Sequence, residues 1–202
     1  VFTEFLEYTT VKTKGNVQAN VILNSQVSAD QKVTLTGKKV LIAVGSVHGM
    51  LGISCITAGN MSEIRTGLHV GLKQETMEQR IDVNERYSKV NQELEDTVAS
   101  MAKIMRVRQQ SGELSEPLQK HLVELKRRKD EIYTRCMEIK KEANAMESMV
   151  LAAREAKIRV EGNIYHGVVI SIDNHDMVIN RDTSFMEYQC QNGIITGTVV
   201  VV

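Results

Sequence analysis

The sequence predicts an α+β protein in which a long antiparallel helical hairpin interrupts a β domain. The first observation is the placement of helix breakers. Between Gly71 and Gly162 the 202-residue chain has one glycine, Gly112, and its only proline, Pro117. The second is charge, because 30 of the 50 charged residues lie between positions 74 and 154. The other twelve glycines punctuate the flanks. We therefore predict three parts: β structure at 1–73, a helical insertion at 74–154 and β structure at 155–202.

The first flank, 1–73, has short alternating apolar and polar stretches separated by turn formers. Three segments share the order apolar, polar, small, turn former: Val17–Asn20, Val27–Asp30 and Ile56–Gly59. Alternating stretches at 33–36 and 40–44 lie between them. Strands that bury one face on the rung below, with small residues at the corners, give this pattern and favour a β-solenoid. A β-sandwich gives a similar pattern and stays open from the residues alone.

The central segment carries two stripes of apolar residues spaced alternately three and four apart. This spacing keeps one stripe facing a partner helix and predicts a coiled-coil seam. On the first helix the seam comprises Val83, Tyr87, Val90, Leu94, Thr97, Met101 and Ile104. On the second it comprises Leu118, Leu122, Leu125, Lys129, Ile132, Cys136, Ile139, Ala143, Met146 and Val150. Apolar residues therefore form both stripes, apart from Thr97 and Lys129.

The two stripes match each other when the chain folds back near Gly112. Leu94 then lies beside Ile132, and the equivalent pairing holds along both helices. The same alignment sets Thr97 opposite Lys129, so both polar interruptions share one layer. We therefore predict an antiparallel hairpin. At about 1.5 Å per residue each arm would span on the order of 50 Å, and we expect it to project from the β part.

The ends of the predicted helices have suitable residues. Thr76 and Gln79 have capping-box spacing for the start of the first helix. Gly112 suits a left-handed helix end, and Ser115 with Pro117 suits the start of the second helix.

The second flank, 155–202, returns to a β pattern. An apolar stretch at 164–172 precedes a predicted turn at Asp173–Asp176 and a short strand at 177–180. A further strand around 185–190 precedes Asn192-Gly193, a strong signal for a two-residue hairpin turn. An apolar run from Ile194 to Val202 closes the chain.

The composition argues against several classes of function. Only 4% of residues are aromatic, while 42% are hydrophobic, which suits rungs of valine, isoleucine, leucine and alanine. A formal net charge of zero gives no reason to expect nucleic acid or an anionic membrane. No apolar run approaches the roughly 20 residues that cross a bilayer. Cys55, Cys136 and Cys190 are odd in number and far apart, which favours a reducing compartment, and we expect the cytoplasm.

No catalytic, cofactor-binding or metal-binding pattern stands out, and we expect none. The five histidines lack metal-type spacing. Glu161, Asp173, Asp176 and Asp182 would supply the carboxylates of a polysaccharide-cleaving β-helix. However, Asp173 and Asp176 flank an Asn-His turn, where aspartate commonly bonds its own backbone. The basic run Lys126–Lys129 has acidic neighbours and is interpreted as a solvated helix face.

Two motifs flank the helical segment. The exit motif, Thr66–Gly71, lies where the chain leaves the β part for the helices, and the return motif, Val160–Ile172, lies where it re-enters the β part. The central residues of the return are Ile164, Tyr165, Gly167, Val168 and Ile170. Together with glycine-rich rungs at 45–60, their order and spacing resemble the flagellar assembly protein A family of bacteria, long catalogued as a domain of unknown function. The resemblance covers nearly the whole chain, although the family usually has proline where this chain has His166.

This resemblance implies a right-handed parallel β-helix interrupted by a coiled coil. It also implies a role in flagellar assembly or cell-pole organisation. Members of the family are longer, and Val1 is not an initiator, so we expect further rungs and another domain before this segment.

We therefore predict a non-enzymatic scaffold that binds a protein partner through its helical arm or through the flank of its β-helix. We expect no nucleic acid, cofactor or membrane span, and the oligomeric state stays open, a homo-oligomer included. One alternative is a bactofilin-like polymer in which β-helices stack end to end through unpaired terminal rungs. A smooth filament, however, needs no long arm. The other alternative is a carbohydrate-active β-helix enzyme. It is disfavoured because the β segments have few acidic residues and few aromatic side chains on which a sugar could stack.

Overall fold

The computed structural model describes residues 1–37 and 40–200, so Val201 and Val202 of the predicted closing run lie outside the described residues. The described residues form fourteen strands and two helices. The elements are β1 (Phe5–Glu7), β2 (Thr10–Thr13), β3 (Val17–Ala19), β4 (Val21–Ala29), β5 (Lys32–Leu35), β6 (Leu41–Gly49), β7 (Gly52–Cys55), β8 (Thr57–Ala58), β9 (Thr66–Val70), α1 (Gln74–Ser111), α2 (Glu116–Arg154), β10 (Ile158–Ile164), β11 (Val168–Ile172), β12 (His175–Val178), β13 (Thr183–Gln191) and β14 (Ile194–Val199).

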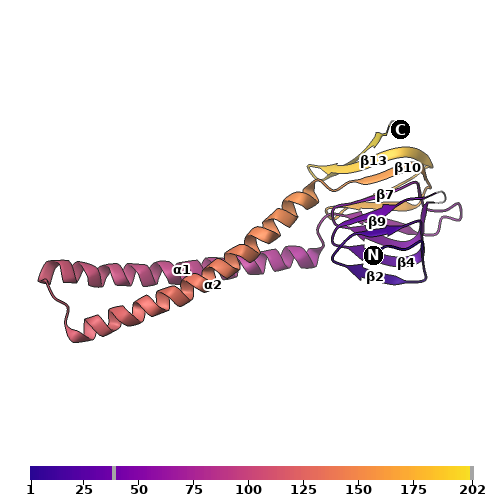
Figure 1. Ribbon diagram of the computed structural model, residues 1–202. Coiled ribbons are helices and arrows are strands. Elements are labelled where there is room, and N and C mark those ends of the chain that lie inside the picture. The colour runs from indigo at the N-terminus through magenta and orange to yellow at the C-terminus, as the bar shows by residue number, and fades with distance from the viewer. Residues whose placement is uncertain (38–39, 201–202) are drawn as a thin grey trace. The chain divides into compact units, whose positions relative to one another are not determined.

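The chain divides into two compact units. One comprises Val1–Gln74 and Met149–Val202, and the other comprises Glu75–Ser148. The first unit is a parallel β-solenoid, whose stacked strands run from β2 and β4 at one end to β13 at the other (Figure 1). The second unit is an antiparallel helical hairpin. The predicted α+β class, with a solenoid interrupted by a helical hairpin, is therefore confirmed.

Parallel strands stack in three columns, which we call faces A, B and C. Face A comprises β1, the first halves of β4 and β6, then β8 and the end of β10. Face B comprises β2, the second halves of β4 and β6, then β9 and β11. Face C comprises β3, β5, β7 and the start of β10. Each circuit of the chain thus adds one strand to each face.

Stacked apolar side chains fill the interior of the solenoid. Face A contributes Leu6, Ile22, Ile42, Ala58 and Ile164; face B contributes Val27, Val47, Leu68 and Ile170; and face C contributes Val17, Val33, Ile53 and Ile158. All of these residues are buried, and burying one such side chain contributes roughly 1.5–3 kcal/mol. Alternation of inward and outward residues therefore fixes the register of the rungs.

The repeated segments seen in the sequence are not equivalent rungs. Val17–Ala19 lies on face C, the end of β4 lies on face B, and Thr57–Ala58 lies on face A. Register pairs instead join Val17 to Val33, sixteen residues on, and Val21 to Leu41, twenty residues on. The true rung is therefore longer and more variable than the short pattern suggested.

The helices interrupt a single rung of the solenoid. The chain leaves face B at Val70, the end of β9, and resumes on face C at Ile158, which pairs with Ile53. Beside this point, within the solenoid unit, Leu72, Met50, Val150 and Ala153 form a small buried cluster. The last turn of α2 therefore belongs to the solenoid unit, and the solenoid resumes in register after the insertion.

Antiparallel strands end the parallel stack. β12 pairs with β11, β13 pairs with β10, and β14 pairs with β13. The turn between β13 and β14 is Asn192-Gly193, as predicted, and both residues have positive φ. The turn predicted at Asp173–Asp176 is shorter than expected. Asp173 and Asn174 have positive φ and form a two-residue turn, whereas His175 and Asp176 already belong to β12.

Two long helices make the hairpin unit. α1 ends near Gly112, which has φ 79° and donates its backbone N–H to the carbonyl of Arg108. Leu114 in the connection packs against residues of both helices, including Ile104 and Leu122. The start of α1 differs from expectation: the helix begins at Gln74, so Thr76 lies inside its first turn and is not the N-cap.

Candidate functional site

Every predicted seam residue of the hairpin is buried or half-buried. The buried ones are Val83, Thr97, Ile104, Leu122, Leu125, Ile132, Cys136 and Val150. The half-buried ones are Tyr87, Val90, Leu94, Met101, Leu118, Lys129, Ile139, Ala143 and Met146. Their individual roles in holding the helices together stay a prediction, which a substitution below tests.

The two polar seam residues are satisfied separately. The Thr97 hydroxyl donates to the backbone carbonyl of Glu93 at 2.8 Å, within its own helix. The Lys129 ammonium pairs with Asp130 at 3.0 Å. A buried hydroxyl that finds a partner one turn back costs little. Each polar residue therefore sits in the hairpin without needing the other.

Ion pairs connect the two helices along their length. Arg80 pairs with Glu147 at 2.9 Å, and Arg86 pairs with Glu142 at 3.1 Å. Glu93 accepts hydrogen bonds from two arginines of α2, Arg128 and Arg135. The arginines around Glu93 hold the pKa of its carboxyl below its usual range, with the Arg128 hydrogen bond as the largest cause. Exposed ion pairs stabilise little. However, positions 80, 86 and 93 of α1 pair with positions 147, 142 and 135 of α2, and this descending order fits only an antiparallel alignment.

One face of α2 exposes two large side chains beside lysines. Tyr133 and Met137 are 53% and 48% exposed, and they line a shallow hollow of about 660 Å³ together with Lys140 and Lys141. Residues 133, 137, 140 and 144 follow one another at helical spacing, so they share one side of the helix. We call Tyr133, Met137, Lys140, Lys141 and Asn144 the α2 stripe. The stripe offers large side chains that the hairpin itself leaves exposed.

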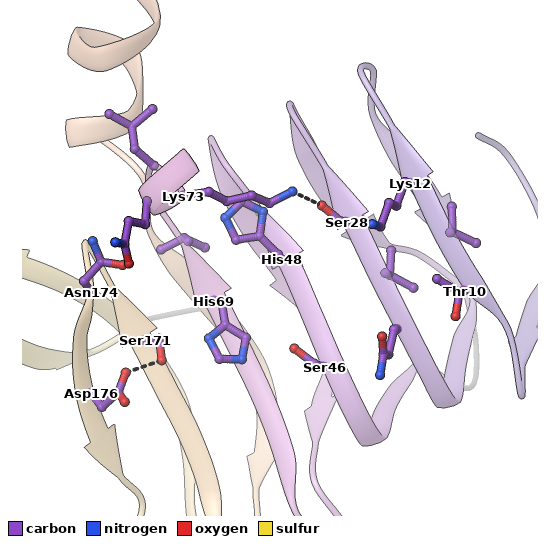
Figure 2. A pocket seen from close by; sticks show the side chains of 16 residues that line it. Thr10, Lys12, Ser28, Ser46, His48, His69, Lys73, Ser171, Asn174 and Asp176 are labelled. Atoms are coloured by element: carbon purple, nitrogen blue, oxygen red, sulfur yellow. Dashed lines mark hydrogen bonds between the residues drawn. The ribbon is translucent and has the colours of Figure 1, made fainter. Parts of the chain in front are cut away.

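A polar groove of about 540 Å³ runs across face B of the solenoid. Its central row comes from one outward position on each successive strand, because each residue is the register partner of the next. The row is Lys12, Ser28, His48, His69, Ser171 and Asp176. Figure 2 shows these side chains on one side of the sheet, with Lys73 extending past His48 to Ser28. We call this row the face B ladder.

His48 lies close to the Lys73 side chain and is half-buried (Figure 2). Its Nε2 lies 3.1 Å from the carbonyl oxygen of Gly71, and its Nδ1 is buried without a partner. Burial, the largest cause, and the nearby Lys73 charge lower the pKa of His48 to about 4. The imidazole is therefore neutral near pH 7. Since a carbonyl only accepts, Nε2 carries the proton and Nδ1 is an acceptor.

The far end of the ladder is acidic. The Ser171 hydroxyl donates to the Asp176 carboxylate, and His69 lies on the neighbouring strand β9. Burial lowers the pKa of His69 against the opposing effect of Asp176. A side chain on Gly67 would collide with the His69 ring, so the glycine makes room for the imidazole. The ladder thus runs from lysines through neutral imidazoles to a carboxylate.

A comparison with known families decides the identity of this architecture. The family described as the Flagellar Assembly Protein A beta solenoid domain matches residues 1–195. The chain belongs to this family. The resemblance inferred from the exit and return motifs is therefore confirmed. The comparison with curated proteins and the comparison with solved structures each found no match.

The residues predicted to form the family motif lie in the last parallel rung. Ile164 lies on face A, Val168 and Ile170 lie on face B, and all three are almost completely buried. Gly167 has φ 83° at the corner between these faces, and the half-buried Tyr165 donates its backbone N–H to Ala58. These contacts give the return motif a structural role in this chain.

Gly71 closes the exit motif in a conformation that favours glycine. Its φ is 96°, and a Cβ at this position would overlap the Asp173 carboxylate. Its carbonyl also accepts the hydrogen bond from His48. The end of the exit motif therefore touches both the antiparallel turn and the groove.

His166, at the position where the resemblance led us to expect proline, contacts two carboxylates. Nδ1 lies 2.6 Å from Asp182 Oδ1, and Nε2 lies 2.9 Å from Glu63 Oε1. Because each carboxylate oxygen accepts, both ring nitrogens carry a proton in this arrangement. The Asp182 hydrogen bond, followed by that of Glu63, raises the pKa of His166. An imidazolium here ties together three segments of the solenoid unit, at Glu63, His166 and Asp182.

The carboxylates considered for catalysis are engaged separately. Glu161 pairs with Arg159, Asp176 with Ser171, and Asp182 with His166. Asp173 lies in a turn, and burial raises the pKa of its carboxyl. Within residues 1–37 and 40–200, no group of three or more metal-ligating side chains comes together. Neither helix that the structure describes has the length and apolar character of a membrane-spanning segment.

Sequence reasoning missed the face B ladder altogether. Its six residues are separated by 16, 20, 21, 102 and 5 positions, as their register pairs show. No fixed period reveals such a row, because the rungs differ in length and the helical hairpin intervenes. The sequence offered a weaker signal. Along each strand of face B, polar residues alternate with the apolar residues of the core, so they are expected to point outward.

Proposed function

We propose that this chain is a non-enzymatic scaffold in flagellar assembly, and that its helical hairpin binds a protein partner. The observation that carries the proposal is the α2 stripe, where Tyr133 and Met137 lie one helical turn apart and are both exposed beside the same hollow. Tyrosine and methionine are enriched in protein interfaces. A convex rod with such a stripe suits docking against a complementary surface better than it suits chemistry, which requires a concave site.

The lysines of the stripe indicate the character of the partner. Lys140 and Lys141 lie beside Met137 in the same hollow, which also includes Glu138. In the described part of the chain neither lysine forms an ion pair. A partner with an apolar groove bordered by acidic residues would satisfy both features of the stripe. The family role in flagellar assembly points to an assembly component as this partner.

Two further observations support a scaffold. Glu161, Asp176 and Asp182 each bond a different nearby side chain, so these three carboxylates do not pair with one another. The three cysteines are free, which agrees with the reducing cytoplasm that we propose as the compartment.

Site-specific photocross-linking in cells tests the proposal. A photoreactive residue at Thr134, within the hollow of the stripe, should capture one protein that mass spectrometry identifies as a flagellar assembly component. The same residue at Ala99, an exposed position on α1, provides the control. Equal capture at both positions, or none at Thr134, would contradict the docking surface.

The captured partner then allows a quantitative test in solution. Tyr133→Ala with Met137→Ala should weaken binding of the purified partner at least tenfold, since two exposed anchors are lost. Val98→Ala with Met105→Ala is the matched control, because these α1 side chains are 47% and 48% exposed. Partner affinity should be unchanged in the control pair. Motility should fall only with the α2 pair.

A further inference from the structure

The groove on face B contains two lysines that lack an acidic partner. Lys73 Nζ donates to the Ser28 hydroxyl, and Ser28 is the register partner of Lys12. In the part of the chain that the structure describes, neither lysine forms an ion pair. Two ammonium groups therefore converge on one serine at the same end of the groove (Figure 2).

This end of the groove has the chemistry of an anion site. Ammonium groups and a hydroxyl can all donate hydrogen bonds to a carboxylate or a phosphate, and charge-assisted bonds of this kind are strong. The Ser28 hydroxyl accepts from Lys73, which leaves its own proton free to point at a ligand. A neutral ligand would leave both cations uncompensated.

The remaining length of the groove presents side chains that can hydrogen-bond to neutral polar groups. Hydroxyls, amides and neutral imidazoles follow the lysines, and the lining includes no phenylalanine, tyrosine or tryptophan. Nδ1 of His48 is an acceptor without a partner, and an unsatisfied buried acceptor is costly. Lys73 lies close to His48, so we infer that turning its ammonium from Ser28 toward an anion would open a path for a donor. A ligand hydroxyl is such a donor.

A peptide fits this groove less well. The groove crosses strands that are already paired on face B, so no free strand edge lies along it for an added strand. Its apolar lining residues, Val11, Val27, Val70 and Leu72, are buried or half-buried and offer little exposed apolar surface to anchor a peptide. At the far end Asp176 would accept from hydroxyls and repel a second negative charge. These features favour a short ligand with one anionic end and several hydroxyls.

We propose that the face B groove binds a small anionic saccharide, either a sugar phosphate or a sugar acid. Its anionic group lies between Lys12 and Lys73, and its hydroxyls contact His48, His69 and the residues beyond them. The volume of about 540 Å³ lies in the range of small-molecule sites. This site is separate from the α2 stripe, and its test does not depend on the proposed partner.

Titration of the whole chain followed by NMR tests the ligand class. Glucose 6-phosphate and glucuronate are the two anionic sugars, with glucose, inorganic phosphate and tetraglutamate as comparison ligands. We expect saturable shifts of the His48 and His69 ring signals, with at least one anionic sugar binding tenfold or more tightly than every comparison ligand. The stronger of the two sugars identifies the anionic group. Binding by tetraglutamate as tight as that of the sugars, or no shift with either sugar, would overturn the proposal.

Lysine variants test the position of the anionic group. Lys12→Gln with Lys73→Gln should weaken binding of the better sugar at least tenfold, while Lys14→Gln, an exposed lysine outside the groove, should leave affinity unchanged. Circular dichroism verifies that each variant is folded. If the double variant does not fold, Lys12→Gln alone should weaken binding at least threefold, since the Lys12 side chain is exposed and its ammonium forms no ion pair with the described residues. Unchanged affinity in the folded lysine variants would refute the site.

Discussion

At the scale of single residues, the corner between faces A and B holds backbone strain that can be relieved. Tyr8, Asn24 and Val44 have φ of 49°, 46° and 59° at this corner, and the register of β4 with β6 places Asn24 against Val44. Left-handed backbone costs a β-branched residue more than it costs asparagine. We predict that Val44→Asn stabilises the solenoid by on the order of 1 kcal/mol. Urea unfolding would measure the gain, and Asn24→Val, the reverse exchange on the adjacent rung, should lose a similar amount.

The clamp around His166 makes part of the stability depend on pH. Asp182 and Glu63 raise the pKa of His166 above its ordinary value of 6.5. A raised folded-state pKa means that the clamp contributes fully below the unfolded-state value and is lost as pH rises through the folded-state value. We predict that His166→Gln removes this loss of stability between neutral and mildly alkaline pH. NMR titration should show the His166 pKa falling in Asp182→Asn. An identical His166 pKa in that variant would contradict the clamp.

At the scale of elements, the hairpin depends on its seam more than on its many ion pairs. Leu94 is half-buried on α1, and its predicted partner on α2, Ile132, is 4% exposed. Val98, also on α1, is 47% exposed. A carboxylate in the seam would be desolvated without a partner. We predict that Leu94→Asp destabilises the hairpin by about 3 kcal/mol and that Val98→Asp costs less than about 1 kcal/mol. Thermal unfolding followed at the helical circular dichroism signal compares the two, and equal melting would show that the seam is misassigned.

Elements also differ in how far the sequence predicts them. The helical segment was predictable because one glycine and one proline break a long charged stretch, and its apolar period is local. The Asn192-Gly193 turn was predictable because its conformation is fixed by two residues. The rungs were not, since β-solenoid register is set by contacts between strands sixteen or more positions apart. The capping residue Thr76 was misassigned because α1 gains one more half-turn at Gln74.

At the scale of the whole molecule, the insertion interrupts a rung without disturbing the stack. β9 pairs with β11 in unbroken parallel register from Thr66–Val168 to Val70–Ile172, although the helices lie between these strands in the chain. The face B ladder crosses the same point, with His69 before the insertion and Ser171 after it. The groove is therefore a property of the assembled solenoid, and no contiguous stretch of sequence contains it.

The solenoid should consequently fold without the hairpin, provided that the deletion leaves the buried cluster around Leu72 intact. Leu72, Met50, Val150 and Ala153 form this cluster, so the last turn of α2 stabilises the solenoid. We predict that replacing residues 75–148 by a short Gly-Ser linker removes the helical circular dichroism signal and keeps the β signal. Replacing 74–154 also removes Val150 and Ala153 and should cost a further few kcal/mol, about that of a core truncation. Loss of the β signal in the shorter replacement would show that the solenoid requires the hairpin, whereas equal stability of the two would show that the cluster contributes nothing.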